Sequence, residues 1–227
     1  FILAIHCGMK TVELKKESMQ ILKEKSRAKS QITFDEDFNV PDAKPDAGRL
    51  IQNKGRIIMD DVRLTDGKGI LTGNLQVDIL YVGEERGIVS SLTAKLPFEE
   101  TLNLKNIING DKMCLKWEIE DLTIRLIHSR KLNIKALVTF CATVDETEQI
   151  RLPVALDAEE VSVRKKTVRF LGLTVHKKDT LRIKDEYTIA SNRPDIASLI
   201  WYTMDVRGLD LKPEENVVKA RGELSVF

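Results

Sequence analysis

Residues 71–81, LTGNLQVDILY, alternate between apolar and polar side chains. This period of two predicts a β-strand with one buried face, made of Leu71, Gly73, Leu75, Val77, Ile79 and Tyr81. The same alternation runs through KLNIKALVTF, residues 131–140. There the apolar face is made of Leu132, Ile134, Ala136, Val138 and Phe140. Both stretches are therefore predicted to be half-buried strands.

Turn signals separate these strands from their neighbours. The segments TDGKG (65–69), GEERG (83–87) and HSR (128–130) predict tight hairpin connections. In LKWEIEDLTIRL, residues 115–126, the alternation slips at Asp121, which predicts a β-bulge. Long strands joined by short loops, without an amphipathic helix of twelve or more residues, predict an all-β fold. A β-sandwich and an open barrel of antiparallel strands both fit this pattern.

A phrase occurs twice in the chain. AKPDAGRLI (43–51) returns 149 residues later as NRPDIASLI (192–200), and twelve identities link residues 12–78 to residues 161–227 at that offset. The markers of this repeat are Pro45 and Pro194, Asp46 and Asp195, and Gly73 and Gly222. We interpret the repeat as a duplication.

The repeat sets the expected domain boundaries. Residues 1–11 are interpreted as a leader or cloning remnant, 12–160 as a first β unit and 161–227 as a second, truncated unit. Either the chain is a fragment of a longer protein, or the period straddles a domain whose half-repeats pair differently. The two units are expected in tandem.

The repeat also changes one local interpretation. Residues 13–25 look helical by composition, but their counterpart, residues 161–175, is rich in β-branched residues, so both are predicted to be strands. The two PD phrases are predicted to form short helical turns, since proline suits the first helical position and aspartate the first turn. A docking role is the alternative for these phrases.

Composition disfavours several classes of partner. With 36 basic and 35 acidic side chains the net charge is near zero, so no strong field favours nucleic acid or anionic membrane. Only 12 aromatic residues are available for stacking on bases or sugars. No apolar run approaches the roughly 18 residues of a membrane span. Three cysteines without a CxxC pair indicate neither a disulfide framework nor a zinc site, and favour a reducing compartment.

Catalytic motifs are missing from the sequence. It contains no GxSxG, Walker, GxGxxG or HExxH pattern. The three histidines (His6, His128, His176) are interpreted as surface residues, and Cys114 and Cys141 as idle thiols rather than nucleophiles. The acidic run 35–38 with Asp42 and Asp46 is interpreted as a solvated edge rather than a calcium site. We therefore expect no enzyme activity, no metal and no cofactor.

Two aromatic residues stand directly after the second phrase. Trp201 and Tyr202 are candidate protein-contact residues, because aromatic side chains anchor many interfaces. Packing inside a core is the favoured alternative.

The combined pattern resembles the SPOCS domain family of spore-envelope proteins. The resemblance rests on PDxxxLI at 45–51, GxLxVxILY at 73–81 and LPFEETLNL at 96–104. The second copy, RPDIASLIWY (193–202) with RGELSVF (221–227), resembles a further SPOCS unit in the same tandem. The resemblance covers residues 12–227.

This resemblance implies a structural role in spore coat or exosporium assembly. Related proteins act on the mother-cell side of the forespore surface, often with a C-terminal LysM module, which in SipL-like members docks on the coat-basement ATPase. The first hypothesis is a non-enzymatic scaffold that contacts other coat proteins or copies of itself. The second is a cell-envelope binding protein in which SPOCS units are spacers for a LysM glycan-binding end. The third hypothesis is that the protein is an enzyme.

Overall fold

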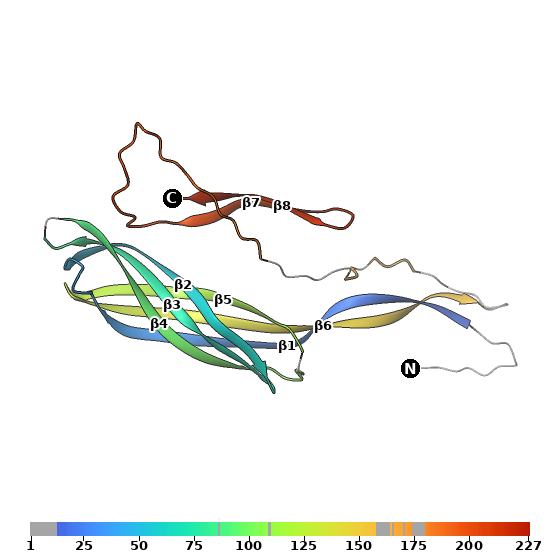
Figure 1. Ribbon diagram of the computed structural model, residues 1–227. Coiled ribbons are helices and arrows are strands. Elements are labelled where there is room, and N and C mark those ends of the chain that lie inside the picture. Colours follow the sequence, from blue (N-terminus) through green and yellow to red (C-terminus); the bar gives the residue numbers. More distant parts are fainter. Residues whose placement is uncertain are drawn as a thin grey trace.

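The computed structural model describes residues 13–85, 87–108, 110–157, 164, 166–169, 171–173 and 180–227. Its strands are β1 (Glu13–Asn39), β2 (Ala47–Thr65), β3 (Lys68–Gly83), β4 (Val89–Asn103), β5 (Met113–His128), β6 (Lys131–Asp157), β7 (Met204–Pro213) and β8 (Val218–Val226). All strand pairs are antiparallel, and no helix occurs within those ranges (Figure 1). The all-β prediction is confirmed. No helix in this part of the chain could span a membrane.

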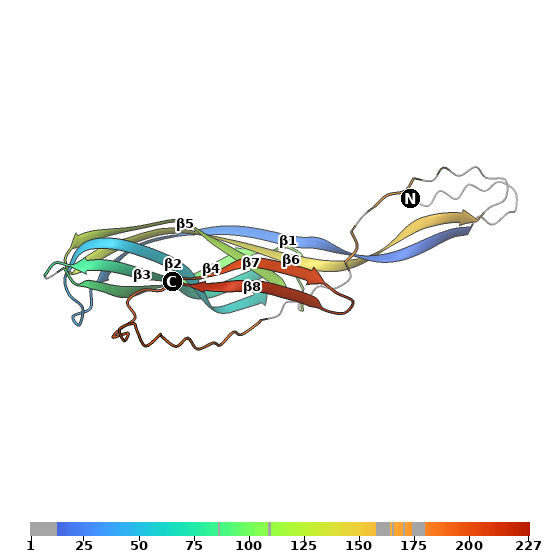
Figure 2. The same cartoon turned by 90° about the horizontal axis from the view of Figure 1, so that it is seen from above.

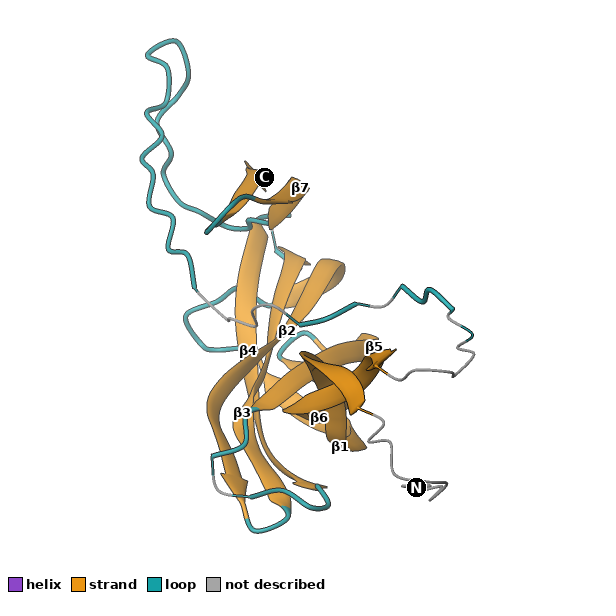
Figure 3. Cartoon of the chain, turned by 90° about the vertical axis from the view of Figure 1, so that its right-hand side faces the viewer, coloured by secondary structure: helices purple, strands orange, loops and turns teal. Residues whose placement is uncertain are grey.

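The first six strands form a β-sandwich. One sheet has the order β1-β6-β5 and the other β2-β3-β4 (Figure 3). Contacts between the sheets also join β2 to β5 and β1 to β4 at the margins. Of the two architectures that the sequence left open, the structure has the sandwich.

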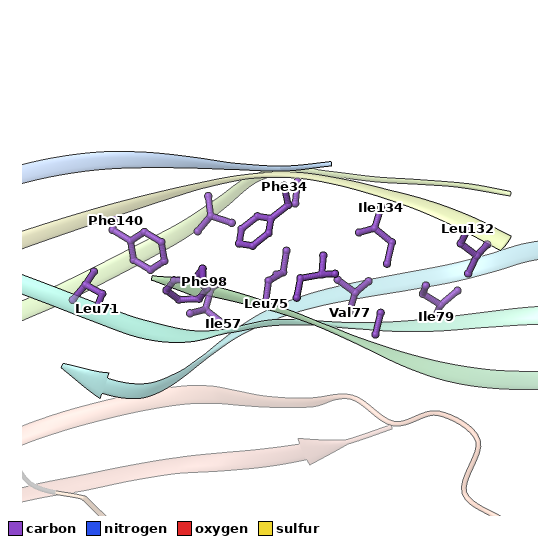
Figure 4. Close-up of a cluster of buried hydrophobic side chains, with 14 of the residues drawn as sticks. Phe34, Ile57, Leu71, Leu75, Val77, Ile79, Phe98, Leu132, Ile134 and Phe140 are labelled. Carbon is purple, nitrogen blue, oxygen red and sulfur yellow. The ribbon is translucent and has the colours of Figure 1, made fainter. Parts of the chain in front are cut away.

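The core lies between the central strands β3 and β6. Figure 4 shows their side chains meeting in the space between the sheets. Every apolar member of the two predicted faces is buried, with Leu75, Val77, Ile134 and Phe140 fully so. Phe98 of β4 joins the faces, because its ring centroid lies 5.2 Å from that of Phe140 and 6.2 Å from that of Phe34. The two predicted strand faces are confirmed.

The predicted turns and the predicted bulge are present. Turns at residues 66–67 and 129–130 join β2 to β3 and β5 to β6, and residues 84, 85 and 87 lie in turns between β3 and β4. The register of β5 against β6 shifts between Ile119 and Asp121. Gly67 has a φ of 79°, a conformation that glycine adopts without strain.

Residues 13–25 belong to β1, as predicted. The strands β1 and β6 are both longer than the sandwich, and their pairing continues to Glu13↔Asp157. Strand β5 leaves β6 much earlier, at Met113↔Val144. The outer ends of β1 and β6 therefore form a two-stranded ribbon that extends away from the sandwich (Figure 2).

The prediction of a matching strand at 161–175 is wrong at the residues that the structure describes there. Residues 164, 166–169 and 171–173 are outside any strand. The strand β1 pairs with β6 along its whole length, whereas residues 164, 166–169 and 171–173 belong to no sheet in the described part of the chain. The rest of 161–175, and the expected leader at 1–11, lie outside the described residues.

The prediction of helical turns at the PD phrases is also wrong. Pro45 and Asp46 follow a turn at residues 42–44 and directly precede β2, which begins at Ala47. Residues 194–203 form neither helix nor strand. In the first phrase the physical reason is that the Asp46 carboxylate binds a distant arginine instead of the start of a helix.

Candidate functional site

Arg130 is the centre of a polar cluster at one end of the sandwich. Its Nη1 donates hydrogen bonds to Asp46 Oδ1 and to the Lys44 carbonyl, each at 2.9 Å. Its Nη2 donates to the Val40 carbonyl and to Asp42 Oδ1, each at 3.0 Å. The bond to Asp46 raises the pKa of Arg130. This Arg130 cluster ties the crossover between β1 and β2 to the turn between β5 and β6.

The rest of the first PD phrase contacts both sheets. The Tyr81 hydroxyl of β3 donates to the Pro45 carbonyl at 2.9 Å, and Ser129 Oγ donates to Asp46 Oδ2 at 3.3 Å. The Glu84 amide donates to the Asp46 carbonyl at 2.8 Å. Pro45 and Asp46 therefore lie where three connections of the sandwich meet. Their contacts hold these connections together, which is a structural role.

Gly73 and Gly222 lie at equivalent positions, beside the register shift of their hairpins. Gly73 pairs with Met59 just before a register shift in β2. A Cβ on Gly73 would lie 2.9 Å from Phe98 Cζ and would collide with the Ile58 carbonyl oxygen. At Gly222 the nearest atom would be the Arg207 carbonyl oxygen, 3.4 Å away, and Arg207 stands 149 residues after Ile58. Both glycines allow a close approach at a bulge.

The hairpin β7–β8 repeats the pairing of β2–β3. Three pairs, each shifted by 149 residues, show the match: Gly55↔Val77 and Met204↔Val226, Asp61↔Thr72 and Asp210↔Arg221, Leu64↔Gly69 and Pro213↔Val218. The register shift also recurs at the equivalent place. The unit boundaries 12–160 and 161–227 stay predictions.

The hairpin β7–β8 has two chemically opposite faces. Its apolar face consists of Met204, Val206, Leu211, Val218, Ala220, Leu224 and Val226, and its polar face of Asp205, Arg207, Asp210, Lys212, Lys219, Arg221, Glu223 and Ser225. The apolar face is open to solvent: Val206 is 65% exposed, whereas its counterpart Ile57 is 9% exposed. Leu224 is 46% exposed, and its counterpart Leu75 is fully buried.

Sequence reasoning missed this surface. The signal was present, because MDVRG (204–208) and VKARGELSV (218–226) alternate in the same way as residues 71–81. The alternation predicts a face suited to burial. It does not tell whether a covering sheet is available.

Trp201 and Tyr202 lie beside the outer face of β2–β3–β4. With Leu199 and Ile200 they line an open cavity of about 270 Å³. The opposite wall consists of Lys54, Arg56, Gln76, Asp78, Ser91, Leu92 and Thr93. The structure thus brings both aromatic residues next to the first sandwich, and their role as partner contacts stays a prediction. Tyr202 is 43% exposed.

The carboxylate of Asp78 organises the sheet side of this cavity. It accepts hydrogen bonds from Thr93 Oγ1 at 2.7 Å and from Gln76 Nε2 at 3.0 Å. Arg56 Nη2 lies 3.4 Å from its other oxygen. Through these contacts the polar side chains on this face of the sheet are paired with one another.

The acidic run 35–38 faces cations and an amide. Asn133 Nδ2 donates to both Asp35 and Asp37, at 2.9 and 3.0 Å. Lys135 and Lys131 lie 2.8 Å from the same two carboxylates, and these bonds lower the pKa of Asp35 and Asp37. Asp42 and Asp46 belong to the Arg130 cluster instead. In the described ranges no group of acidic, cysteine and histidine side chains could hold a metal ion.

The cysteine and histidine residues are spread over separate places. Cys114 is exposed on β5, and Cys141 is half-buried on β6 opposite Lys116. His128 ends β5, and its Nδ1 accepts a hydrogen bond from the Arg130 amide at 3.2 Å. Cys7, His6 and His176 lie outside the described residues.

A second polar junction lies where the ribbon meets the sandwich. Lys25 Nζ is 2.8 Å from Asp111 Oδ2, and their side chains are 14% and 12% exposed. Asp111 also accepts the Ile108 amide at 2.8 Å, and these bonds, that from Lys25 most, lower its pKa. The junction fixes the crossover between β4 and β5. No local sequence pattern predicts this pair, because 86 residues separate the partners.

Residues 46–127 match the family described as "SipL, SPOCS domain". The matched segment contains the complete β2-β3-β4 sheet and nearly all of β5. No curated protein and no solved structure matches the chain.

Proposed function

Residues 46–127 belong to the SPOCS domain family, which makes this a sporulation-related protein, and from that premise we propose that it is a non-enzymatic scaffold of the spore envelope. It acts in coat or exosporium assembly through protein–protein contacts. Its place is the mother-cell side of the forespore surface. Its partners are other coat proteins or further copies of the same chain.

The observation that carries this proposal is the match of residues 46–127 to the SPOCS domain family. The matched segment contains the complete β2-β3-β4 sheet and nearly all of β5, which together supply most of the first sandwich.

The titratable groups also support a structural role. The carboxylates with a lowered pKa within the described ranges are Glu24, Asp35, Asp37 and Asp111, and each faces a cation: Arg27, Lys135, Lys131 and Lys25. Catalytic carboxylates instead converge on a pocket, where burial shifts their pKa towards the working pH. Three of these pairs join neighbouring strands or loops, and the fourth, Glu24–Arg27, lies within β1.

The proposal is tested by locating the protein during sporulation. A fluorescent fusion expressed from its own promoter should form a ring around the forespore and be absent from vegetative cells. A fusion that carries Leu75→Asp, which places a charge in the core, should stay diffuse or be degraded. A native fusion that stays diffuse in the mother cell throughout sporulation would contradict the proposal.

A further inference from the structure

We infer that the Lys25–Asp111 pair is a clasp that holds the β1–β6 ribbon in one fixed direction relative to the first sandwich. The ribbon consists of residues 13–24 of β1 and 145–157 of β6, and it extends away from the sandwich (Figure 2). With the clasp in place the ribbon is a rigid arm, and without it the ribbon swings about its base. This inference goes beyond the proposed function and does not depend on it.

Two changes in the sheet coincide at the base of the ribbon. Strand β5 pairs with β6 only as far as Met113↔Val144, so the sheet loses its third strand there. Strand β1 shifts its register against β6 between Glu24 and Ser26, and Ser26 pairs with the same Val144. Lys25 is therefore the extra residue of a β-bulge, a feature that bends a strand and increases its twist. The ribbon begins at a bulge, where only two strands continue.

The packing of the ribbon itself does not fix its direction. Within the described part of the chain no third strand pairs with it. Its most sheltered apolar side chains, which include Met19, Ile21 and Ile150, are only half-buried. A two-stranded ribbon needs packing against other elements to be stable in water. The direction of the ribbon is therefore set at its base.

The crossover between β4 and β5 is fastened to this base near both of its ends. Near its start, the Lys105 amide donates to Ser26 Oγ at 2.9 Å. Near its end, Asp111 Oδ2 lies 2.8 Å from Lys25 Nζ. Asp111 also accepts the Ile108 amide at 2.8 Å, so the crossover holds the carboxylate in place. Two consecutive residues of the bulge thus bind the two ends of one loop.

The shielding of the clasp from water makes its geometry specific. The side chains of Lys25 and Asp111 are 14% and 12% exposed, less than in any other ion pair of the described ranges. Separating two shielded charges leaves each of them poorly solvated, so such a pair favours one arrangement of the elements that carry it. An exposed pair such as Lys23–Glu148 lacks this property, because water solvates the separated charges.

One further contact reaches the ribbon at a distance from its base. The Leu173 amide donates to the Gln20 carbonyl at 2.9 Å, and a Cβ on Gly172 would lie 3.2 Å from Met19 Cε. Residues 171–173 belong to no strand, so this contact is one hydrogen bond from an irregular segment. The two bonds at the bulge join the ribbon to the sandwich directly, and we assign the control of direction to them.

Pulsed electron–electron double resonance on the 227-residue chain tests the clasp. Spin labels are attached at Ser18→Cys on the ribbon and Thr101→Cys on β4, both exposed positions, after the three native cysteines are replaced by serine. The chain with its clasp intact should give one narrow distribution of distances between the labels. Lys25→Met should at least double the width of this distribution. Lys23→Met is the matched control, because it removes an exposed, ion-paired lysine two residues away and should leave the width unchanged.

Two more variants keep the test decisive if Lys25→Met weakens the sandwich, which the urea midpoint checks. Asp111→Asn keeps the size of the side chain but removes its charge, and it should also broaden the distribution. Lys25→Arg keeps the charge and should preserve the narrow distribution. A broad distribution with the clasp intact would overturn the inference. An unchanged width in Asp111→Asn, or equal broadening by Lys23→Met, would overturn it as well.

Discussion

The hairpins β2–β3 and β7–β8 share one register and one bulge but have opposite surroundings. In the first, Leu75 and Val77 are fully buried; in the second, Leu224 and Val226 are 46% and 62% exposed. The alternation of side chains is therefore sufficient for the hairpin and its pairing. Burial comes from elsewhere, through the long strands β1 and β6 that approach from distant parts of the sequence.

This difference teaches where the stability of the unit lies. Strand pairing supplies hydrogen bonds, but their net contribution is small because water offers equivalent bonds. The main stabilisation comes from the apolar surface that is removed from water when the two sheets pack together. Substitutions at equivalent positions of the two hairpins separate these contributions.

The largest expected effect comes from the paired substitutions Leu75→Ala and Leu224→Ala. The first removes a fully buried side chain and should lower the free energy of unfolding by about 2–5 kcal/mol. The second should change unfolding of the first sandwich by less than about 0.5 kcal/mol. Urea titration of the Trp117 fluorescence, in a Trp201→Phe background and at concentrations that keep the chain monomeric, measures both. Equal losses would break the comparison.

The glycine pair should give the next largest difference. Gly73→Ala brings a Cβ against the Ile58 carbonyl and Phe98, and should cost about 1–3 kcal/mol. Gly222→Ala meets its nearest atom at 3.4 Å and should cost less. Thermal unfolding by circular dichroism would register the difference. If Gly73→Ala were neutral, the close approach at the bulge would not constrain the fold.

The two PD phrases give a third test. Asp46→Asn removes one of the two charged partners of Arg130 and should lower the urea midpoint of the sandwich. Asp195→Asn should leave this midpoint unchanged, because Asp195 is exposed and lies outside the strands of the sandwich. A larger effect from Asp195→Asn would show that the second phrase supports the first sandwich.

The smallest of the expected effects is the loss of stability of the first sandwich at acid pH. The pKa values of Asp35, Asp37 and Asp111 are below the ordinary aspartate value of 3.8 in the folded chain. Their contribution to stability is therefore complete above that value and is lost as pH falls through the folded pKa values. The urea midpoint should decrease as the pH is lowered below about 4. Asp111→Asn should make this decrease of the midpoint with pH less steep. A slope unchanged by Asp111→Asn would exclude the Lys25 junction as a source.

Much of the fold could be predicted from the sequence because its signals are local. The alternation at 71–81 and 131–140 correctly identified the central strands and their buried faces. The glycine-containing turns and the phase slip at Asp121 placed the hairpin ends and the bulge. Each of these depends on residues that are neighbours in the chain.

The errors and omissions depend on distant residues. Proline and aspartate at 45–46 predicted a helical turn, but Arg130, 84 residues away, binds the Asp46 carboxylate. Residues 161–175 have the composition of a strand, yet those described there are outside any strand. Lys25 and Asp111, likewise, could not be joined by pattern alone. The exposed face of β7–β8 was visible as alternation, but its exposure depends on whether a cover exists.

Amide hydrogen exchange tests the central claim most directly, because it compares the two hairpins within one molecule. At low concentration, amides of β3 should exchange slowly and those of β8 fast, although both strands have the same register. Equal, slow exchange of both strands in the monomer would contradict the claim that only β2–β3 has a covering sheet.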